Sequence, residues 1–146
     1  MNFDTGRFIL KIAETSEELH AAQRLRYKVF VEEMGANVAD DCHASRMEYD
    51  KFDQDFDHLI LIDSLNRNTA ENVVGVYRLM LNTSVNNNRG FYSSSEYNLD
   101  KLIKADRKIL ELGRSCIDKQ HRGGVALHMM WNGLAQYVID NNVEVL

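Results

Sequence analysis

The sequence predicts an α/β (α+β) fold, a sheet with packed helices, that is cut short at its C-terminus. Two observations support this prediction. Apolar runs of strand length alternate with two long segments of helical periodicity. The chain then ends at Leu146, inside another apolar run that begins at Val143. A sheet that stopped there would keep an open edge, which natural domains usually cover. Residues 1–146 are therefore interpreted as one domain, incomplete at its C-terminus.

The composition is that of a globular domain, with 45% hydrophobic and 27% charged residues. The net charge of −5 argues against nucleic acid as a partner. No apolar run approaches the roughly 20 residues of a membrane span, and the first residues contain no signal peptide. Cys42 and Cys116 lack the spacing of a metal site. Because Cys116 lies in an apolar run, a buried free thiol is favoured over a disulfide, which predicts a cytoplasmic location.

The first strand is predicted over residues 7–13, where Phe8, Leu10 and Ile12 fall on one face. The segment Thr15-Ser16-Glu17-Glu18 is a capping box that starts a helix. The apolar stripe of this helix consists of Leu19, Ala22, Leu25, Val29 and Phe30. Arg26 lies near the edge of that stripe, a position from which an arginine can face a cleft.

Residues 35–57 have weak periodicity and many acidic side chains, which is typical of a functional or disordered loop. The spacing from Asp53 to Asp57 resembles a calcium loop, but His58 stands where such a loop needs glycine. Two alternatives remain at this point. The loop is either a solvated acidic segment, or it presents carboxylates, Asp50 and Asp53 above all, to a cationic substrate.

Residues 58–63 and 73–81 are predicted to form an antiparallel hairpin. An Asn-rich loop is expected over residues 82–90 and a short helix over residues 99–105.

The next strand, residues 109–117, is apolar but carries Glu111 and Arg114. Buried charges are costly unless they are paired or take part in chemistry. Residues three apart on a regular strand face opposite sides, so these two share a cleft only if a β-bulge intervenes, and Gly113 is suited to one. An acid–base pair at a cleft and a structural ion pair are both consistent with this pattern.

A glycine-rich turn, residues 118–124, leads into a second long helix over residues 125–140. Free amides and the dipole at a helix N-terminus favour an anion, so Arg122, Gly123 and Gly124 form a candidate phosphate site. The helix is expected to bury a face made of Leu127, Met130, Trp131, Leu134 and Val138.

The segment Arg26-Tyr27-Lys28-Val29-Phe30-Val31-Glu32-Glu33-Met34-Gly35 is the first of several specific motifs. The others are Asp50-Lys51-Phe52-Asp53, Val74-Gly75-Val76-Tyr77-Arg78-Leu79, Phe91-Tyr92-Ser93-Ser94-Ser95-Glu96-Tyr97, Glu111-Leu112-Gly113-Arg114-Ser115-Cys116 and Arg122-Gly123-Gly124. Together, over about residues 8–146, they resemble the bacterial L-ornithine N(α)-acyltransferases of ornithine-lipid biosynthesis. That family belongs to the GNAT superfamily and is related to the acyl-homoserine-lactone synthases.

The resemblance implies a GNAT-like mixed central sheet flanked by helices, with the C-terminal part of the fold missing. Its fourth and fifth strands would splay apart to admit a phosphopantetheine arm, and residues 143–146 would begin the fifth. The implied reaction transfers a 3-hydroxy fatty acyl group from acyl carrier protein to the α-amine of ornithine or a similar amino acid, giving lyso-ornithine lipid. No metal or redox cofactor is implied, because the acyl group arrives on the carrier's phosphopantetheine. Because the product carries an acyl chain, contact of the enzyme with the inner face of the membrane is also expected.

The resemblance also implies two catalytic residues. Glu111 would accept a proton from the α-ammonium, because only the neutral amine attacks a thioester. Arg114 would orient Glu111 or contact the substrate. Backbone amides near Gly113 would stabilise the oxyanion.

Binding residues follow in the same way. Arg26 and Arg78 would bind the carboxylate of the amino acid, and Asp50 and Asp53 its side-chain ammonium. The phosphopantetheine site would consist of Gly113, Ser115, Arg122, Gly123 and Gly124. The turn departs from the RGxG pattern of the superfamily, which argues against coenzyme A as the donor.

Basic residues before the Glu111 strand offer a docking patch for the acidic carrier protein, although solvated surface charge is the somewhat better explanation of them. They are Lys101, Lys104, Arg107 and Lys108. Two alternative functions remain. One is an acyl-homoserine-lactone synthase that uses S-adenosylmethionine and shares the arginine, aspartate and Glu-x-x-Arg positions. The other is a non-catalytic truncated fragment that binds a carrier protein or another chain through its open strand edge.

Overall fold

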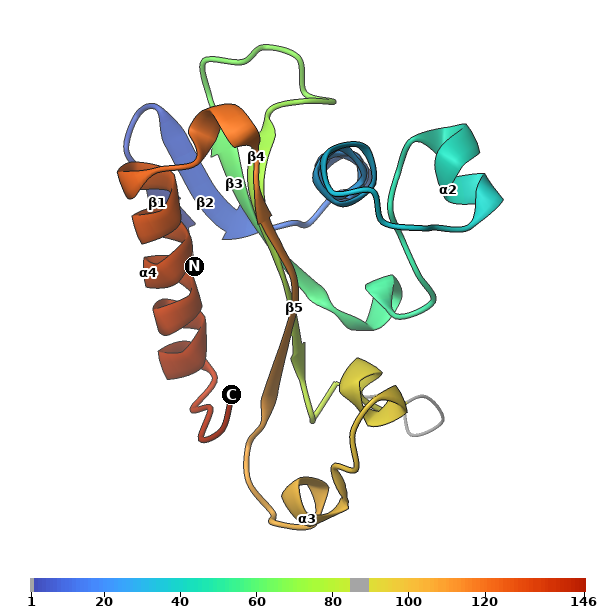
Figure 1. Ribbon diagram of the computed structural model, residues 1–146. Coiled ribbons are helices and arrows are strands. Elements are labelled where there is room, and N and C mark those ends of the chain that lie inside the picture. The colour runs from blue at the N-terminus through green and yellow to red at the C-terminus, as the bar shows by residue number, and fades with distance from the viewer. Residues whose placement is uncertain (1, 85–89) are drawn as a thin grey trace.

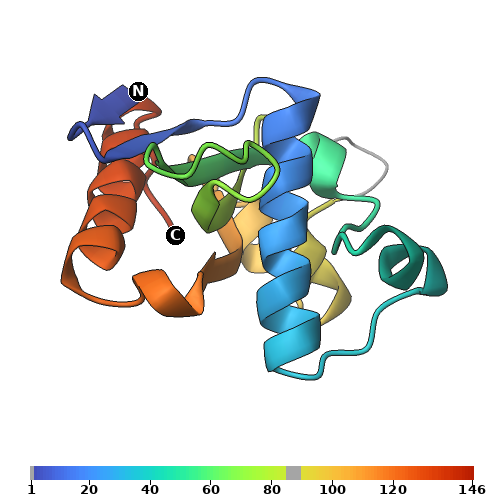
Figure 2. The same cartoon turned by 90° about the horizontal axis from the view of Figure 1, so that it is seen from above.

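The fold is a single sheet between two long helices, seen in a computed structural model that describes residues 2–84 and 90–146. Five strands pair antiparallel in the order β1-β2-β3-β4-β5. They are β1 (Asn2–Asp4), β2 (Phe8–Ile12), β3 (Asp57–Asp63), β4 (Val73–Leu81) and β5 (Leu110–Ile117). The α-helices are α1 (Ser16–Arg26), α2 (Asp40–Ser45), α3 (Asp100–Ile103) and α4 (Gly124–Asp140). Helices α1 and α4 cover opposite faces of the sheet (Figure 1, Figure 2).

The strands divide their side chains between two cores. In β3, Leu59 and Leu61 pack with α4, whereas Ile60 packs with α1. This alternation follows from the two-residue period of a strand, and it explains why β3 is apolar throughout. A third cluster, which includes Phe52, Met80 and Phe91, has Tyr92 of the candidate site packed against it.

The predicted strands are confirmed, including the antiparallel pairing of β3 with β4. Strand β1 was not predicted, because its three residues are all exposed and lack an apolar pattern. The expected mixed sheet is antiparallel across its five named strands. Its parallel part is one bridge between Ile109 and Val145, where the predicted last strand begins. In the predicted loop over residues 82–90, positions 85–89 lie outside the described residues.

Helix α1 begins at the predicted capping box. The Glu18 amide donates to Thr15 Oγ1 over 3.2 Å, and the Thr15 amide donates to Glu18 Oε2 over 3.3 Å. The helix continues as a π-helical segment over Tyr27–Glu33. Such segments often occur at functional sites, because the wider turn changes which side chains face inward.

The acidic segment before β3 is ordered. It contains α2 and a 3-10 turn over Asp53–Asp55, and it buries Glu48 and Asp53. The reading as a solvated loop is therefore wrong for these two carboxylates.

The face that α4 buries differs from the predicted one. Met130 and Leu134 are buried as expected, but Leu127 and Trp131 are 48% and 55% exposed. The helix instead turns Gly133 toward the sheet, where its missing side chain permits a close approach to Leu10. Apolar spacing alone did not reveal this, because a glycine contact carries no hydrophobic signal.

Replacing Gly133 with valine should lower the free energy of unfolding by about 3 kcal/mol. A Cβ at this position would lie 2.4 Å from Leu10 Cδ2 and 3.2 Å from Leu10 Cγ, so the buried Leu10 side chain would have to shift. Urea unfolding followed by circular dichroism measures the change. Gly124→Val is the matched control, because a Cβ there meets nothing within 4 Å. Equal stability of the two variants would contradict this packing.

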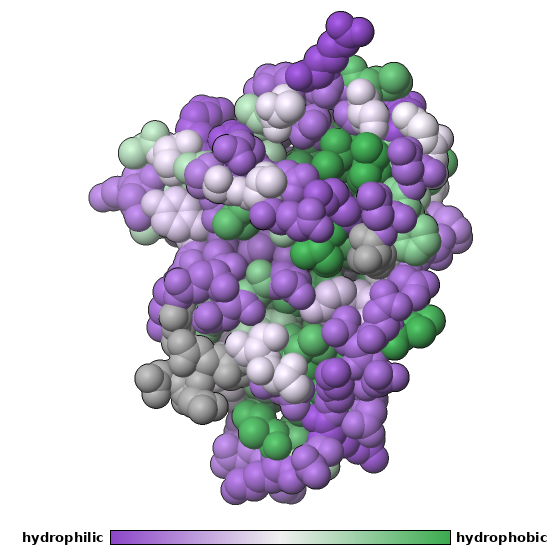
Figure 3. Space-filling view, turned by 180° about the vertical axis from the view of Figure 1, so that it is seen from behind, coloured by the Kyte–Doolittle hydropathy of each residue, from purple (hydrophilic) through white to green (hydrophobic). Residues whose placement is uncertain are grey.

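The surface is mostly hydrophilic, with separate hydrophobic patches on the face seen from behind (Figure 3). Both cysteines are buried free thiols, as predicted. Burial raises the pKa of the Cys116 thiol to about 12, so it stays protonated. Among the described residues, none of the helices has the length and apolar character needed to span a membrane.

Candidate active site

Three arginines and three carboxylates meet between α1, β4, β5 and the acidic segment. We call this group the ion cluster. Its members are Arg26, Arg78, Arg114, Glu48, Asp50 and Asp53.

Asp53 is the centre of the ion cluster. One of its oxygens accepts from Arg26 Nη1 and from Arg78 Nη1, both over 2.9 Å, and the other accepts from Gln23 Nε2 over 2.9 Å. Arg26 also donates from Nε to Glu48 Oε2 over 2.5 Å. These contacts join the end of α1 to the middle of β4.

The remaining contacts of the ion cluster extend outward to β5. Arg114 Nε donates to Glu48 Oε1 over 2.9 Å, and Arg114 Nη2 lies 3.5 Å from Asp50 Oδ2. Asp50 also accepts from Arg78 Nη1 over 2.8 Å. The side chains of Arg114 and Asp50 are 27% and 24% exposed, so these two members alone reach the solvent edge substantially.

Electrostatics hold Asp53 in its charged form. Burial alone would raise its pKa, but the charge of Arg26 and the hydrogen bonds from Arg26, Arg78 and Gln23 outweigh burial and lower the pKa below its ordinary value of 3.8. A carboxyl whose pKa is lower in the folded chain adds stability above its unfolded pKa and loses it as the pH falls through the folded value.

The stability of the chain should therefore fall as the pH drops below about 4, with Asp53 contributing to the slope. Asp53→Asn should make the pH dependence of the unfolding free energy shallower between pH 5 and pH 3, whatever its effect at neutral pH. Urea unfolding at a series of pH values measures both slopes. Parallel curves for the wild type and the variant would show that Asp53 is not linked to folding in this way.

The structure does not fit the expected contact of Arg26 and Arg78 with a substrate carboxylate. Their side chains are 0% and 1% exposed, and their charges are already matched by Asp53 and its neighbours. Asp53, which is 7% exposed, is likewise too enclosed to hold a substrate ammonium. These three residues therefore form the buried base of the ion cluster. They stay paired with one another, because a buried ion that loses its partner is strongly destabilising.

The predicted β-bulge in β5 is present, one residue further along than Gly113. Arg78 pairs with Gly113 and Val76 with Cys116, so Arg114 and Ser115 together oppose the single residue Tyr77. The positive φ of 49° belongs to Arg114. The extra residue turns Arg114 onto the face of β5 that carries Glu111.

Glu111 and Arg114 do not form an ion pair with each other, which was one of the two alternatives that the sequence left open. The Glu111 carboxylate accepts from the Tyr92 amide over 2.9 Å, the Ser93 amide over 2.7 Å and Ser93 Oγ over 2.5 Å. Arg114 instead lies over the Tyr92 ring, with 5.2 Å between its guanidinium carbon and the ring centroid. Both charged residues therefore contact Tyr92, Glu111 through its backbone amide and Arg114 through its ring.

A cavity of about 390 Å³ opens beside the bulge. Arg114, Ser115 and Glu48 line one side, and Phe30 of the π-helical segment lines another. The predicted site residue Ser115 thus borders the cavity next to the ion cluster. This volume suits a small polar molecule with an apolar contact.

The predicted phosphate turn leads into the exposed N-terminus of α4. Gly123 has a φ of 147°, which favours glycine, and no side chain caps the helix. Arg122 does not point into this turn, because its guanidinium binds both oxygens of Glu33 over 2.5 and 2.7 Å. The expected contact of Arg122 with a phosphate in this turn does not fit the structure, whereas the predicted phosphate site at Gly123 and Gly124 stays a prediction.

A second polar cluster braces this turn. His121 bridges Asp63 and Asp118 with a 3.1 Å contact from each ring nitrogen, and Lys28 binds Asp118 over 2.5 Å. These contacts connect the ends of β3 and β5 to the start of α4.

With this geometry in view, the comparisons with known proteins are informative. A model of the acetyltransferase (GNAT) domain family matches residues 25–132. The chain belongs to the GNAT family. The match includes all of the ion cluster, β5 and the first half of α4, so the site lies within the GNAT domain.

The relatives of this GNAT chain are longer. It is 43% identical over 138 residues to a protein named L-ornithine N(alpha)-acyltransferase from Rhodobacter capsulatus, covering 94% of this chain and 53% of that protein. The chain spans about half the length of the curated relatives it matches.

Two solved structures share the GNAT-like fold. FeeM, an N-acyl amino acid synthase from uncultured soil microbes, has a TM-score of 0.68 and 15% identity, covering 97% of this chain and 70% of that one. The AHL synthase LasI has a TM-score of 0.63 and 20% identity, covering 96% of this chain and 71% of that one.

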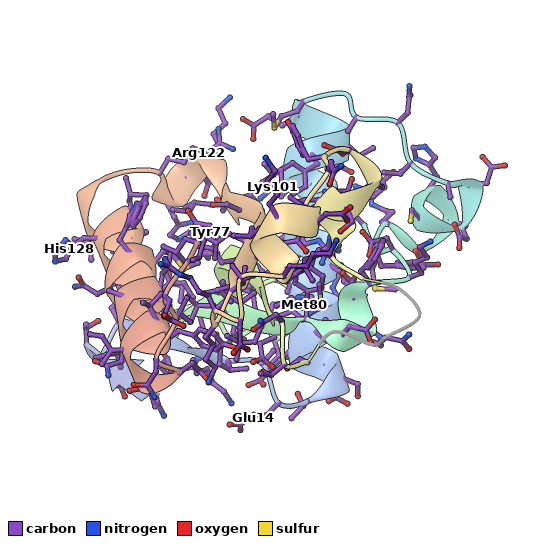
Figure 4. The ribbon with its side chains drawn as sticks, turned by 90° about the horizontal axis from the view of Figure 1, so that it is seen from below. Glu14, Tyr77, Met80, Lys101, Arg122 and His128 are labelled. Atoms are coloured by element: carbon purple, nitrogen blue, oxygen red, sulfur yellow. The ribbon has the colours of Figure 1, made fainter. Side chains whose placement is uncertain are left out.

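The basic patch of this GNAT domain lies far from the phosphate turn. Lys101 is on α3, which lies at the end of the molecule that faces the viewer in Figure 4, whereas Gly123 and Gly124 follow the opposite end of β5 (Figure 1). Eight strand residues span about 25 Å. A carrier protein is bonded directly to the phosphate of its phosphopantetheine arm, so it would be expected to dock near the phosphate turn. The basic patch lies at the other end of β5 from that turn.

Three important neighbours in this GNAT site were not singled out from the sequence. Glu48 was one acid among many in its segment, and Tyr92 and Ser93 stood in a motif without an assigned role. Nothing in their local pattern distinguishes them. They could be expected only from a general rule: buried Arg26 and half-buried Glu111 must each have hydrogen-bond or ion-pair partners.

Proposed function

We propose that this chain carries the site of an N-acyltransferase that moves a 3-hydroxy fatty acyl group from acyl carrier protein to the α-amine of ornithine, giving lyso-ornithine lipid. The observation that carries the proposal is Glu111, a half-buried carboxylate held by Tyr92 and Ser93 on the face of β5 that also carries Arg114, which borders the cavity. The name of the Rhodobacter capsulatus relative supports the choice of ornithine. No metal or redox cofactor is required, because a thioester is already an activated acyl group.

Glu111 would act as the proton acceptor. The α-ammonium of the amino acid loses its proton to the carboxylate, directly or through one water, and the neutral nitrogen then attacks the thioester carbonyl. The new carbon–nitrogen bond gives a tetrahedral intermediate with one negative oxygen and a positively charged nitrogen. Its collapse breaks the carbon–sulfur bond and releases the carrier thiolate, which takes up the proton that the nitrogen loses as the amide forms, while Glu111 returns its own proton to water.

Backbone amides would stabilise the charges that develop during the reaction. On the outer side of β5, no named strand pairs within the part of the chain that the structure describes, so amides near Gly113 and Ser115 can face the thioester oxygen. The first amides of α4, after Gly123 and Gly124, would bind the phosphate of the phosphopantetheine arm.

The solvent edge of the ion cluster would recognise ornithine. Arg114 is placed to bind the substrate carboxylate, and Asp50 to bind the side-chain ammonium, because both retain partial exposure. Arg26, Arg78 and Asp53 would then hold Asp50 and Arg114 in position from beneath.

A thiol-release assay tests the proposal. The purified chain is mixed with 3-hydroxyacyl carrier protein and, in separate reactions, ornithine, lysine, glutamine or S-adenosylmethionine. Thiol release that requires ornithine supports the proposal. Release that requires S-adenosylmethionine would instead identify an acyl-homoserine-lactone synthase. Carrier binding without release under any condition would favour the non-catalytic interaction module.

A further inference from the structure

A short 3-10 turn over Tyr92–Ser95 lies against the carboxylate of Glu111. We propose that Ser93 in this turn is a positioning residue, which orients Glu111 so that one defined lone pair faces the reacting amine. This inference rests on the proposed function, because it assigns a role within the same reaction. It adds a residue to which no catalytic part has been given above.

The contacts of Glu111 leave little freedom to its carboxylate. Oε1 accepts both the Ser93 amide over 2.7 Å and Ser93 Oγ over 2.5 Å, while Oε2 accepts the Tyr92 amide over 2.9 Å. Two carboxylate oxygens offer about four lone-pair positions. Among the described residues, donors of one turn occupy three of these positions, and the fourth, on Oε2, would take the proton of the substrate ammonium.

The turn itself is anchored, so it can impose this orientation. Phe91, directly before it, is 5% exposed in the core cluster that includes Phe52. The Tyr92 ring packs edge-to-face on Phe52, with 5.5 Å between ring centroids. The same ring lies 5.5 Å from the guanidinium carbon of Arg78 and 5.2 Å from that of Arg114.

Tyr92 and Ser93 thus connect Glu111 with the ion cluster, between which the described residues form no direct hydrogen bond or ion pair. The backbone and hydroxyl of the turn fix Glu111, and the Tyr92 ring rests on the ion cluster that orients Arg114. One segment therefore fixes the position of Glu111, the proposed proton acceptor, relative to Arg114, the cation proposed to bind the substrate carboxylate. Precise placement of reacting groups is worth large rate factors, and small displacements lose them.

A purely structural role for Ser93 would give a different result on mutation. It would lower stability, and it would affect activity to the same extent whether or not residue 111 is glutamate. A positioning role acts through Glu111, so its effect on kcat should vanish once that carboxylate has been removed. Double-mutant cycles measure this coupling directly.

The experiment compares Ser93→Ala, Ser93→Thr, Glu111→Gln and the double variant in the thiol-release assay. Ser93→Ala should lower kcat about tenfold with little change in KM for ornithine, the loss expected for one hydrogen bond to a charged group. Ser93→Thr keeps the hydroxyl and should restore most of the rate. In the Glu111→Gln background, adding Ser93→Ala should change the residual rate less than twofold.

Ser94→Ala is the matched control. Ser94 is exposed, neighbours Ser93 in the same turn, and donates no side-chain hydrogen bond to a described residue. It should keep the wild-type rate. A Ser93→Ala rate equal to that of Ser94→Ala would overturn the inference, as would equal losses from Ser93→Ala in the two backgrounds.

Amide exchange separates failure of this inference from failure of the proposed function. The Tyr92 and Ser93 amides should exchange at least tenfold faster in Glu111→Ala than in the wild type, as seen by ¹H–¹⁵N spectra. An inactive wild-type chain with protected amides would overturn the proposed function and, with it, the catalytic meaning of the contact. Unprotected amides in the wild type would overturn the contact itself.

Discussion

Arg26→Ala should lower the free energy of unfolding by about 3–5 kcal/mol, the largest stability loss we expect from one substitution here. Arg26 is fully buried, and its guanidinium faces Glu48 and Asp53, which are themselves 7% exposed. Removing the arginine leaves Glu48 with Arg114 alone and weakens the hold on Asp53. Both carboxylates would then remain in a region of low dielectric without full compensation.

The control for Arg26→Ala is Arg46→Ala, which removes an arginine from the exposed ion pair with Glu32. Exposed pairs contribute at most about 1 kcal/mol, so this variant should unfold near the wild-type midpoint. Urea unfolding of the three proteins at neutral pH measures the difference. If Arg26→Ala lost no more stability than Arg46→Ala, the ion cluster would not be a structural element of the fold.

Glu111→Gln should reduce ornithine-dependent acyl transfer by about 10²–10⁴-fold, the range associated with loss of a positioned general base. The amide is nearly isosteric, and its oxygen can still accept both hydrogen bonds from Ser93, whereas its NH2 group takes the place of the oxygen that accepts from the Tyr92 amide. It cannot take a proton from the substrate ammonium. The loss should therefore appear in kcat, with an unfolding free energy lowered by only about 1–3 kcal/mol, the cost of one unsatisfied donor.

Glu96→Gln serves as the comparison for Glu111→Gln, because Glu96 follows the same turn but is exposed. Its rate should match that of the wild type. The steady-state rate of thiol release with saturating ornithine is the quantity to compare. A Glu111→Gln rate within a few-fold of the Glu96→Gln rate would exclude Glu111 as the proton acceptor.

The sequence was most informative where periodicity decides structure. The strands, the capping box at Thr15 and the start of the second long helix all follow from local patterns that bury apolar faces. The β-bulge was also predictable in outline, because charges at Glu111 and Arg114 need one to reach the same face. Its location at Arg114, and not at Gly113, depends on the pairing register with β4, which local sequence does not encode.

The roles of individual site residues were harder to predict. Arg26 and Arg78 read as substrate ligands, yet they are enclosed because Glu48 and Asp53 fold over them from a segment without periodicity. The partners of Glu111 lie 18 and 19 residues away in the chain. Such contacts arise from tertiary packing, so the sequence can indicate which residue types are present but not which of them meet.

The most direct test of the central claim is the identity of the product formed by this chain from 3-hydroxyacyl carrier protein and ornithine. Tandem mass spectrometry, with ornithine labelled by ¹⁵N at the α position, locates the new amide. We predict one acyl group on the labelled α-nitrogen, formed with an equal amount of free carrier thiol and lost in Glu111→Gln. Acylation of the side-chain nitrogen, or a product that persists undiminished in Glu111→Gln, would contradict this account of the site.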